Sequence, residues 1–165
     1  MKWLFIFLLC FPVLCVKAQK SFNATIAQTV EQLKCLPADE REPVTLNAQL
    51  VNTKDSIAVV VKVQLAPGWH IYEFVPSTLP YIALERILQV PENIRLTGDW
   101  DKTNPATSVN DPGVLIYEQE AVFVHKAVKL DTGKKDNTIR AGLYYQTCNL
   151  RQCLPPVEKV FELKF

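Results

Sequence analysis

The chain has 165 residues with 18 basic and 17 acidic side chains, which gives a formal net charge of +1. A chain so close to neutrality does not favour binding to nucleic acid or to an anionic membrane surface, because both select a strongly basic face. Its length fits one domain that can bury a sizeable core without disulfide staples.

The N-terminus has the features of an export signal. Lys2 gives a basic start, residues 3–16 form an apolar run, and Ala18 ends a small-residue cleavage pattern. The run is too short to span a bilayer. We therefore expect a signal peptide over residues 1–18, a periplasmic or secreted product, and no direct membrane insertion after cleavage.

A lead-in segment over residues 19–42 follows the predicted signal. Its Ile26, Val30 and Leu33 fall at helical spacing, but one such turn is marginal, so the segment is either partly helical or disordered. The lead-in also contains Cys35, one of the odd number of cysteines that remain after signal cleavage. A free buried or flexible thiol and an intermolecular link are both open roles for Cys35.

The remaining residues, 43–165, have the periodicity of strands. Apolar and polar residues alternate over five stretches, which are 44–50, 57–65, 122–130, 139–145 and 157–165. The first two predict a hairpin around the turn-like residues 52–56. The stretch 81–90 fits a strand better than a short helix.

Two further patterns complete the fold prediction. His125 falls on the parity opposite to the apolar stripe of its strand, so we expect it to be exposed. The connections are rich in Pro and Gly, and strands do not alternate with helices. This organisation predicts an all-β fold, an antiparallel β-sandwich.

A cysteine pair lies between the last two predicted strands. Cys148 and Cys153 stand at the mouth of this hairpin, where facing Cβ atoms can reach disulfide distance. Pro155 and Pro156 restrict the outgoing backbone. A bridge across so short a loop contributes only roughly 2 kcal/mol by chain entropy. A structural disulfide and one that is made and broken both remain open.

The residues around this pair resemble a known family. The pattern Tyr-Gln-x-Cys followed by Cys-x-Pro-Pro resembles the N-terminal periplasmic domain of the bacterial disulfide-interchange reductase DsbD, and it comprises Tyr145, Gln146, Cys148, Cys153, Pro155 and Pro156. The segment Pro-Gly-Trp-His-Ile-Tyr at residues 67–72 matches a Gly-aromatic-x-aliphatic-Tyr segment of the same family. The resemblance covers residues 43–165.

The resemblance implies an immunoglobulin-like domain that exchanges thiols and disulfides, as a protein-disulfide reductase component or an electron carrier. It implies that Cys153 forms the mixed disulfides and that Cys148 resolves them. The implied partners are thioredoxin-like proteins or domains and a membrane electron carrier on other chains. Two departures stand out: the cysteine spacer has four residues rather than five, and the stretch 104–114, which corresponds to an aromatic cap loop, has no Phe or Tyr.

Three side chains are candidates to support the cysteines. His70 and Tyr72 would lie beside them as proton or hydrogen-bond partners if both project from one face of a strand, and otherwise form a core or rim pair. Arg151 lies inside the loop and would favour a thiolate, unless it is simply solvated. The sequence predicts no cofactor and no metal site, since two cysteines without a second ligand pair are a weak metal signature.

A second class of function also fits these residues. The chain would then be a non-catalytic immunoglobulin-like binding or structural module whose disulfide only pins a loop. Reducibility separates the two, because a structural bridge resists the glutathione pool and an exchanging one does not.

Overall fold

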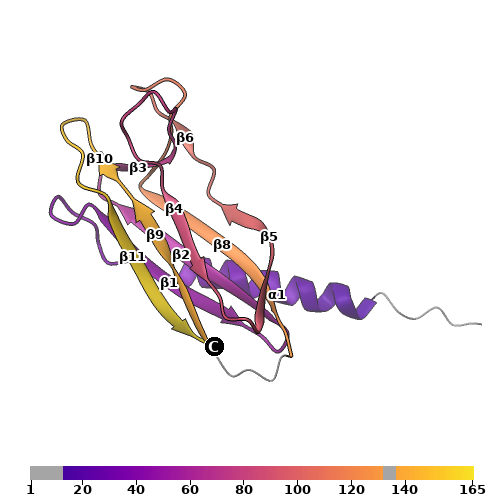
Figure 1. Cartoon of the computed structure of the whole chain (residues 1–165). Coiled ribbons are helices and arrows are strands. Elements are labelled where there is room, and N and C mark those ends of the chain that lie inside the picture. The colour runs from indigo at the N-terminus through magenta and orange to yellow at the C-terminus, as the bar shows by residue number, and fades with distance from the viewer. Residues whose placement is uncertain (1–12, 132–136) are drawn as a thin grey trace, which may run out of the picture.

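The chain passes from one helix into a series of strands (Figure 1). The computed structural model describes residues 13–131 and 137–165. Helix α1 spans Val13–Gln32, and the strands are β1 (Val44–Asn52), β2 (Ser56–Leu65), β3 (His70–Phe74), β4 (Glu85–Gln89), β5 (Ile94–Lys102), β6 (Ala106–Thr107), β7 (Leu115–Glu118), β8 (Glu120–Lys129), β9 (Thr138–Tyr145), β10 (Thr147–Cys148) and β11 (Val157–Lys164).

The expected signal peptide lies mostly outside the described residues. Residues 1–12 are not described, and the remainder of the 1–18 segment belongs to the first part of α1. Within the described ranges, the structure contains no helix with the length and apolar character that a membrane crossing requires.

The strands form antiparallel sheets with the orders β1-β2-β8-β5, β11-β9-β4 and β10-β3-β7-β6. The predicted first hairpin is confirmed, since β1 and β2 pair in register from Val44 opposite Leu65 to Asn52 opposite Ile57. The first two sheets pack face to face, and the third lies at one end of the sandwich (Figure 1). This arrangement confirms the predicted all-β immunoglobulin-like sandwich.

The core fills the space between the first two sheets. Alternate residues of β2 point into it and are at most 3% exposed, namely Ile57, Val59, Val61, Val63 and Leu65. They meet Ile139, Ala141 and Leu143 from β9 of the facing sheet. The period-two pattern of the sequence therefore corresponds to the inner face of each sheet.

Helix α1 covers the outer face of the first sheet. Ile26 of the helix and Leu33, directly after its end, pack against Ala58 and Val60 of β2 and Val124 of β8. Both faces of these two strands are therefore buried, which explains why β2 is apolar at nearly every position.

This double coverage corrects the prediction for His125. Its side chain is buried, at 6% exposure, and its ring forms a T-shaped pair with Trp100 at a centroid separation of 5.0 Å. Val124, on the opposite parity, faces helix α1, whereas His125 shares its parity with the core residue Phe123. The prediction was wrong because it assumed that one face of β8 was exposed to solvent.

The stretch 81–90 forms a strand rather than a helix, but the strand is shorter than predicted. β4 begins at Glu85, and the residues before it run irregularly toward the third sheet, where the Leu84 amide donates to the Tyr72 carbonyl. β10 of the third sheet and the C-terminus lie at opposite ends of the molecule (Figure 1).

Candidate redox site

The two predicted cysteines form a disulfide at the end of the sandwich. Cys148 and Cys153 are joined, their Cα atoms are 4.0 Å apart, and they form an isolated antiparallel bridge between the two arms of the loop. The loop connects β9 and β10 to β11, so two long paired strands fix where it begins and ends.

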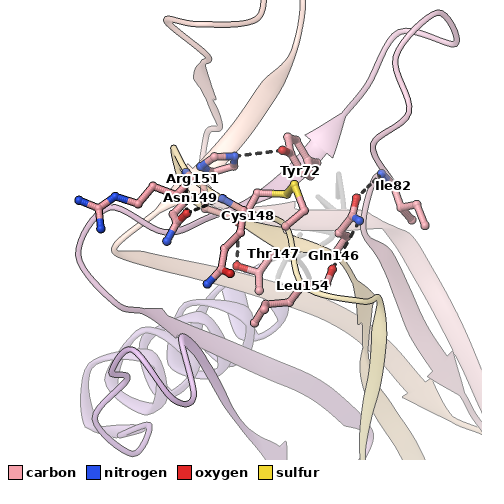
Figure 2. The surroundings of a disulfide bond; sticks show 11 residues. Tyr72, Ile82, Gln146, Thr147, Cys148, Asn149, Arg151 and Leu154 are labelled. Carbon is pink, nitrogen blue, oxygen red and sulfur yellow. Dashed lines mark hydrogen bonds between the residues drawn. A yellow bond between two sulfur atoms is a disulfide. The ribbon is translucent and has the colours of Figure 1, made fainter.

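Asn149 organises this loop from inside (Figure 2). Its side-chain Oδ1 accepts hydrogen bonds from the amides of Arg151 at 2.8 Å and Gln152 at 2.9 Å. Its own amide donates to the Gln152 carbonyl at 2.9 Å. On the other side of the disulfide, the Leu154 amide donates to the Thr147 carbonyl at 2.9 Å. Backbone bonds therefore flank the bridge on both sides.

The two sulfur-bearing residues have opposite exposures. Cys148 is 1% exposed and packs in a small apolar cluster with Tyr72, Val114 and Ile116. Cys153 is exposed. A disulfide partner that approaches from solvent can therefore reach Cys153 directly, whereas Cys148 is covered.

His70 and Tyr72 lie on the same face of β3 and beside the disulfide. The turn at Gly68, which has φ of +78°, precedes β3 and leaves the strand regular through both residues. His70 Nε2 and the Tyr72 hydroxyl are 3.1 Å apart and hydrogen-bonded (Figure 2). His70 is also the register partner of Cys148 across β3 and β10.

Burial controls the protonation of this pair. Desolvation lowers the pKa of His70, against the opposing effect of the Glu118 and Asp111 carboxylates. Desolvation raises the pKa of Tyr72 to about 12, with further contributions from Tyr81 and Asp111. At neutral pH the imidazole is therefore uncharged and the phenol keeps its proton.

Both cysteines, His70 and Tyr72 line one cavity of about 580 Å³. Its other walls include the loop 107–111, in which Val109 is 95% exposed, and Glu118 of β7. The corresponding cap stretch without Phe or Tyr thus does lie beside the cysteines. An aromatic residue from another segment, Tyr81, also lines the cavity, and its ring stacks on Tyr72 with a centroid separation of 4.9 Å.

Gln146 ties the segment that carries Tyr81 to the cysteine loop. Its Oε1 accepts from the Ile82 amide at 3.0 Å, and its Nε2 donates to the Leu154 carbonyl at 3.5 Å (Figure 2). The Gln of the sequence pattern therefore joins two segments that are far apart in the chain.

Arg151 is not brought together with the other candidates. Its side chain extends away from the sulfurs (Figure 2) and lines a neighbouring hollow that includes Glu40 and Trp69. Cys35 also lies elsewhere, as a partly buried free thiol whose Sγ donates to the Lys62 carbonyl at 3.3 Å. Burial raises the pKa of this thiol.

Three residues of the site were missed from the sequence. Tyr81 and Glu118 reach it through long-range strand pairing and stacking, for which the sequence carries no local signal. Asn149 did have a local signal in the sequence, since an Asn at a hairpin tip favours a turn closed by its own side chain. Across residues 13–131 and 137–165, no group of three or more His, Cys, Asp and Glu side chains is placed to hold a metal ion.

The geometry agrees with a family match over most of the chain. Residues 32–164 match the model of the family described as thiol:disulfide interchange protein DsbD, N-terminal. The chain belongs to this family. Membership of the DsbD N-terminal family confirms the resemblance found in the sequence and supports a role in thiol–disulfide interchange.

Solved structures of two related domains are similar to this DsbD N-terminal family member. The N-terminal periplasmic domain of ScsB from Proteus mirabilis aligns with a TM-score of 0.53 and 20% identity, over 79% of this chain and 49% of that chain. The present chain thus spans about half the length of that structure. The DsbD N-terminal domain of Neisseria meningitidis in its reduced form gives a TM-score of 0.49 and 16% identity, over 83% and 93% of the two chains.

A complex between the DsbD N-terminal and PilB N-terminal domains of Neisseria meningitidis aligns with a TM-score of 0.43 and 17% identity, over 77% of this chain and 85% of that chain. A comparison with curated proteins finds no match.

Proposed function

We propose that this protein is a periplasmic carrier that passes two electrons between thiol–disulfide partners through Cys148 and Cys153. The observation that carries the proposal is the unequal exposure of the two cysteines, at 1% for Cys148 against an exposed Cys153. An exposed cysteine beside a covered one suits a reaction in which the first attacks and the second resolves.

The proposed reaction proceeds in two exchanges. In the reduced protein, the Cys153 thiolate attacks a partner disulfide, forms a mixed disulfide and releases one partner thiolate. Cys148 then attacks Cys153, closes the intramolecular bridge and releases the second partner sulfur as a thiolate. The carrier loses two electrons and the partner disulfide gains them. The reverse sequence reloads the carrier.

The proposed partners are thioredoxin-like proteins or domains, together with a membrane electron carrier on another chain. Family membership supports a partner that presents a disulfide. A DsbD N-terminal domain of Neisseria meningitidis forms a complex with a PilB N-terminal domain, which is an example of such a domain engaging another protein. The exported location expected from residues 1–18 would bring the carrier to such partners.

Trapping tests the roles of the two cysteines. In the exported protein with Cys35→Ser, the Cys148→Ser variant should accumulate mixed disulfides with periplasmic proteins, because Cys153 attacks and nothing resolves. Cys153→Ser is the matched control and should capture none. Non-reducing electrophoresis with mass spectrometry detects the mixed disulfides formed by each variant. A Cys148→Ser variant that never captures a partner would refute the assignment.

The reduction potential provides an independent measurement. We expect a value in the exchange range, about −270 to −120 mV. A value below about −300 mV would instead identify a structural bridge and favour a binding module.

A further inference from the structure

Three residues form a row across neighbouring strands of the third sheet. Cys148 of β10 is the register partner of His70 of β3, and His70 is in turn the register partner of Glu118 of β7. Directly opposite residues in antiparallel strands point to the same face, with Cβ atoms about 4.5–5.5 Å apart. All three line the cavity that contains the disulfide. The row therefore places a thiol, an imidazole and a carboxylate side by side.

The covered position of Cys148 creates a need for a proton acceptor. To resolve a mixed disulfide, the Cys148 thiol must lose its proton, since the thiolate is the nucleophile. Cys148 is 1% exposed in the disulfide form, so a thiol in the same position would have little access to water. Apolar surroundings also disfavour its charged form. An acceptor built into the protein would remove this obstacle.

The protonation state and the surroundings of His70 suit a proton acceptor. Desolvation holds its pKa below the ordinary value, so the imidazole is neutral and able to accept a proton at neutral pH. The Tyr72 hydroxyl holds the ring through Nε2. The other titratable groups facing this region are Glu118 from β7, Asp111 from the loop before β7 and Tyr81 from the segment before β4.

We propose that His70 is the general base that accepts the Cys148 proton in the resolving step, and that Glu118 is a positioning residue that stabilises the imidazolium. This proposal rests on the proposed carrier function. The proton moves from Cys148 to His70, and the new Cys148–Cys153 bond forms as the bond from Cys153 to the partner sulfur breaks. The electron pair leaves on the partner sulfur, which takes a proton from the imidazolium or from solvent. In the reverse direction the imidazolium protonates Cys148 as it leaves.

Ellman's reagent separates the two exchanges without a protein partner. Reduced protein with Cys35→Ser should release two equivalents of the coloured thiolate in two phases. The first reports attack by Cys153, and the second, which is independent of reagent concentration, reports resolution by Cys148. His70→Gln should leave the first phase intact and slow the second by about 100-fold near neutral pH, a typical contribution of general base catalysis.

The pH profile distinguishes a base from a merely structural residue. In the parent protein the second phase should slow as pH falls through the lowered pKa of His70, because the imidazole becomes protonated and can no longer accept. Above that pKa the rate should be level. In His70→Gln the second phase should instead rise tenfold per pH unit across this range, because the thiol must ionise unaided.

Glu118→Gln tests the positioning role, with Glu158→Gln of β11 as the matched control on an exposed glutamate of another sheet. Loss of the Glu118 charge should lower the pKa of His70 further, measured by NMR titration. It should move the acid limb of the second phase to lower pH and slow its level part. Glu158→Gln should change neither.

The failures of the two proposals look different. Absence of both phases in the parent protein would refute the carrier function itself. Two phases in the parent, with an unchanged second phase in His70→Gln at every pH, would overturn only the role of His70. If His70→Gln does not fold, NMR titration of the unsubstituted protein tests the role of His70 instead. The His70 ring should sense ionisation of Cys148 in the reduced form as an alkaline titration that the oxidised form lacks, and its absence would overturn the proposal.

Discussion

Asn149 holds the cysteine loop together through atoms that do not belong to the disulfide. Its Oδ1 and its amide close the turn between the two cysteines. A loop that keeps this turn after reduction also keeps the two thiols near each other. Their high effective concentration then favours closure of the bridge.

Asn149→Ala should therefore make the disulfide easier to reduce. The two side-chain bonds are each worth about 0.5–1.5 kcal/mol, so we expect the equilibrium constant for oxidation by glutathione to fall by roughly fivefold or more, up to about 150-fold. Titration with glutathione buffers measures it. Gln152→Ala is the control, because Gln152 takes part in the turn through its backbone atoms. An unchanged constant in Asn149→Ala would show that the cap has no influence on the redox equilibrium.

At the residue scale, the sequence identified part of the site. The pairing of Cys148 with Cys153 followed from their place in a hairpin, and the family from the resemblance of two motifs. Of the two alternatives for His70 and Tyr72, the structure has the one beside the cysteines. Glu118 did not, because its place beside His70 depends on the register between β3 and β7. The sequence left two roles open for Arg151, next to the thiolate or in solvent, and its side chain extends away from the sulfurs (Figure 2).

At the level of elements, helix α1 stabilises the sandwich from outside. Ile26 and Leu33 cover Ala58, Val60 and Val124, whose side chains would otherwise face water. The helix packs on the first sheet, whereas Cys148 belongs to the third sheet and Cys153 is bridged to it. Helix packing and redox chemistry should therefore be separable.

Ile26→Ala should lower the free energy of unfolding by about 2–4 kcal/mol, through lost burial and the cavity left behind. Urea denaturation measures the change, and Gln28→Ala, at an exposed position of the same helix, should have little effect. The glutathione equilibrium constant should be the same in both variants. A large change in that constant for Ile26→Ala would mean that the helix is coupled to the cysteine loop.

The sequence predicted the first hairpin best. β1 alternates clearly, β2 keeps apolar residues at every second position from Ile57 to Leu65, and a turn-like segment joins the two strands. β8 misled the prediction at His125 because helix α1 buries its second face. β4 was predicted too long because residues 81–84 are apolar without belonging to the strand. Tyr81 packs against the cluster around Cys148, and Leu84 packs in the main core.

For the whole molecule, the disulfide is a minor source of stability. It closes a short loop with a sequence separation of 5, whereas the core draws on both facing sheets. A carrier that cycles between two redox states requires this balance, because it must stay folded when the bridge is open.

Reduction should therefore lower the free energy of unfolding by only about 2 kcal/mol while unfolding remains cooperative. Urea denaturation with and without a phosphine reductant measures the difference. The double variant Cys148→Ser with Cys153→Ser should resemble the reduced protein. Loss of the folded state on reduction would be incompatible with a carrier.

The position of the chain end has a practical consequence. Because the C-terminus lies at the end of the molecule opposite the cysteine loop (Figure 1), a tag or solid support joined there would leave Cys153 facing outward. Molecules immobilised in this way would share one orientation and present the same reactive end to the solution. With the proposed attack by Cys153, a column of the Cys148→Ser variant would act as an affinity matrix, from which a reductant elutes the captured proteins.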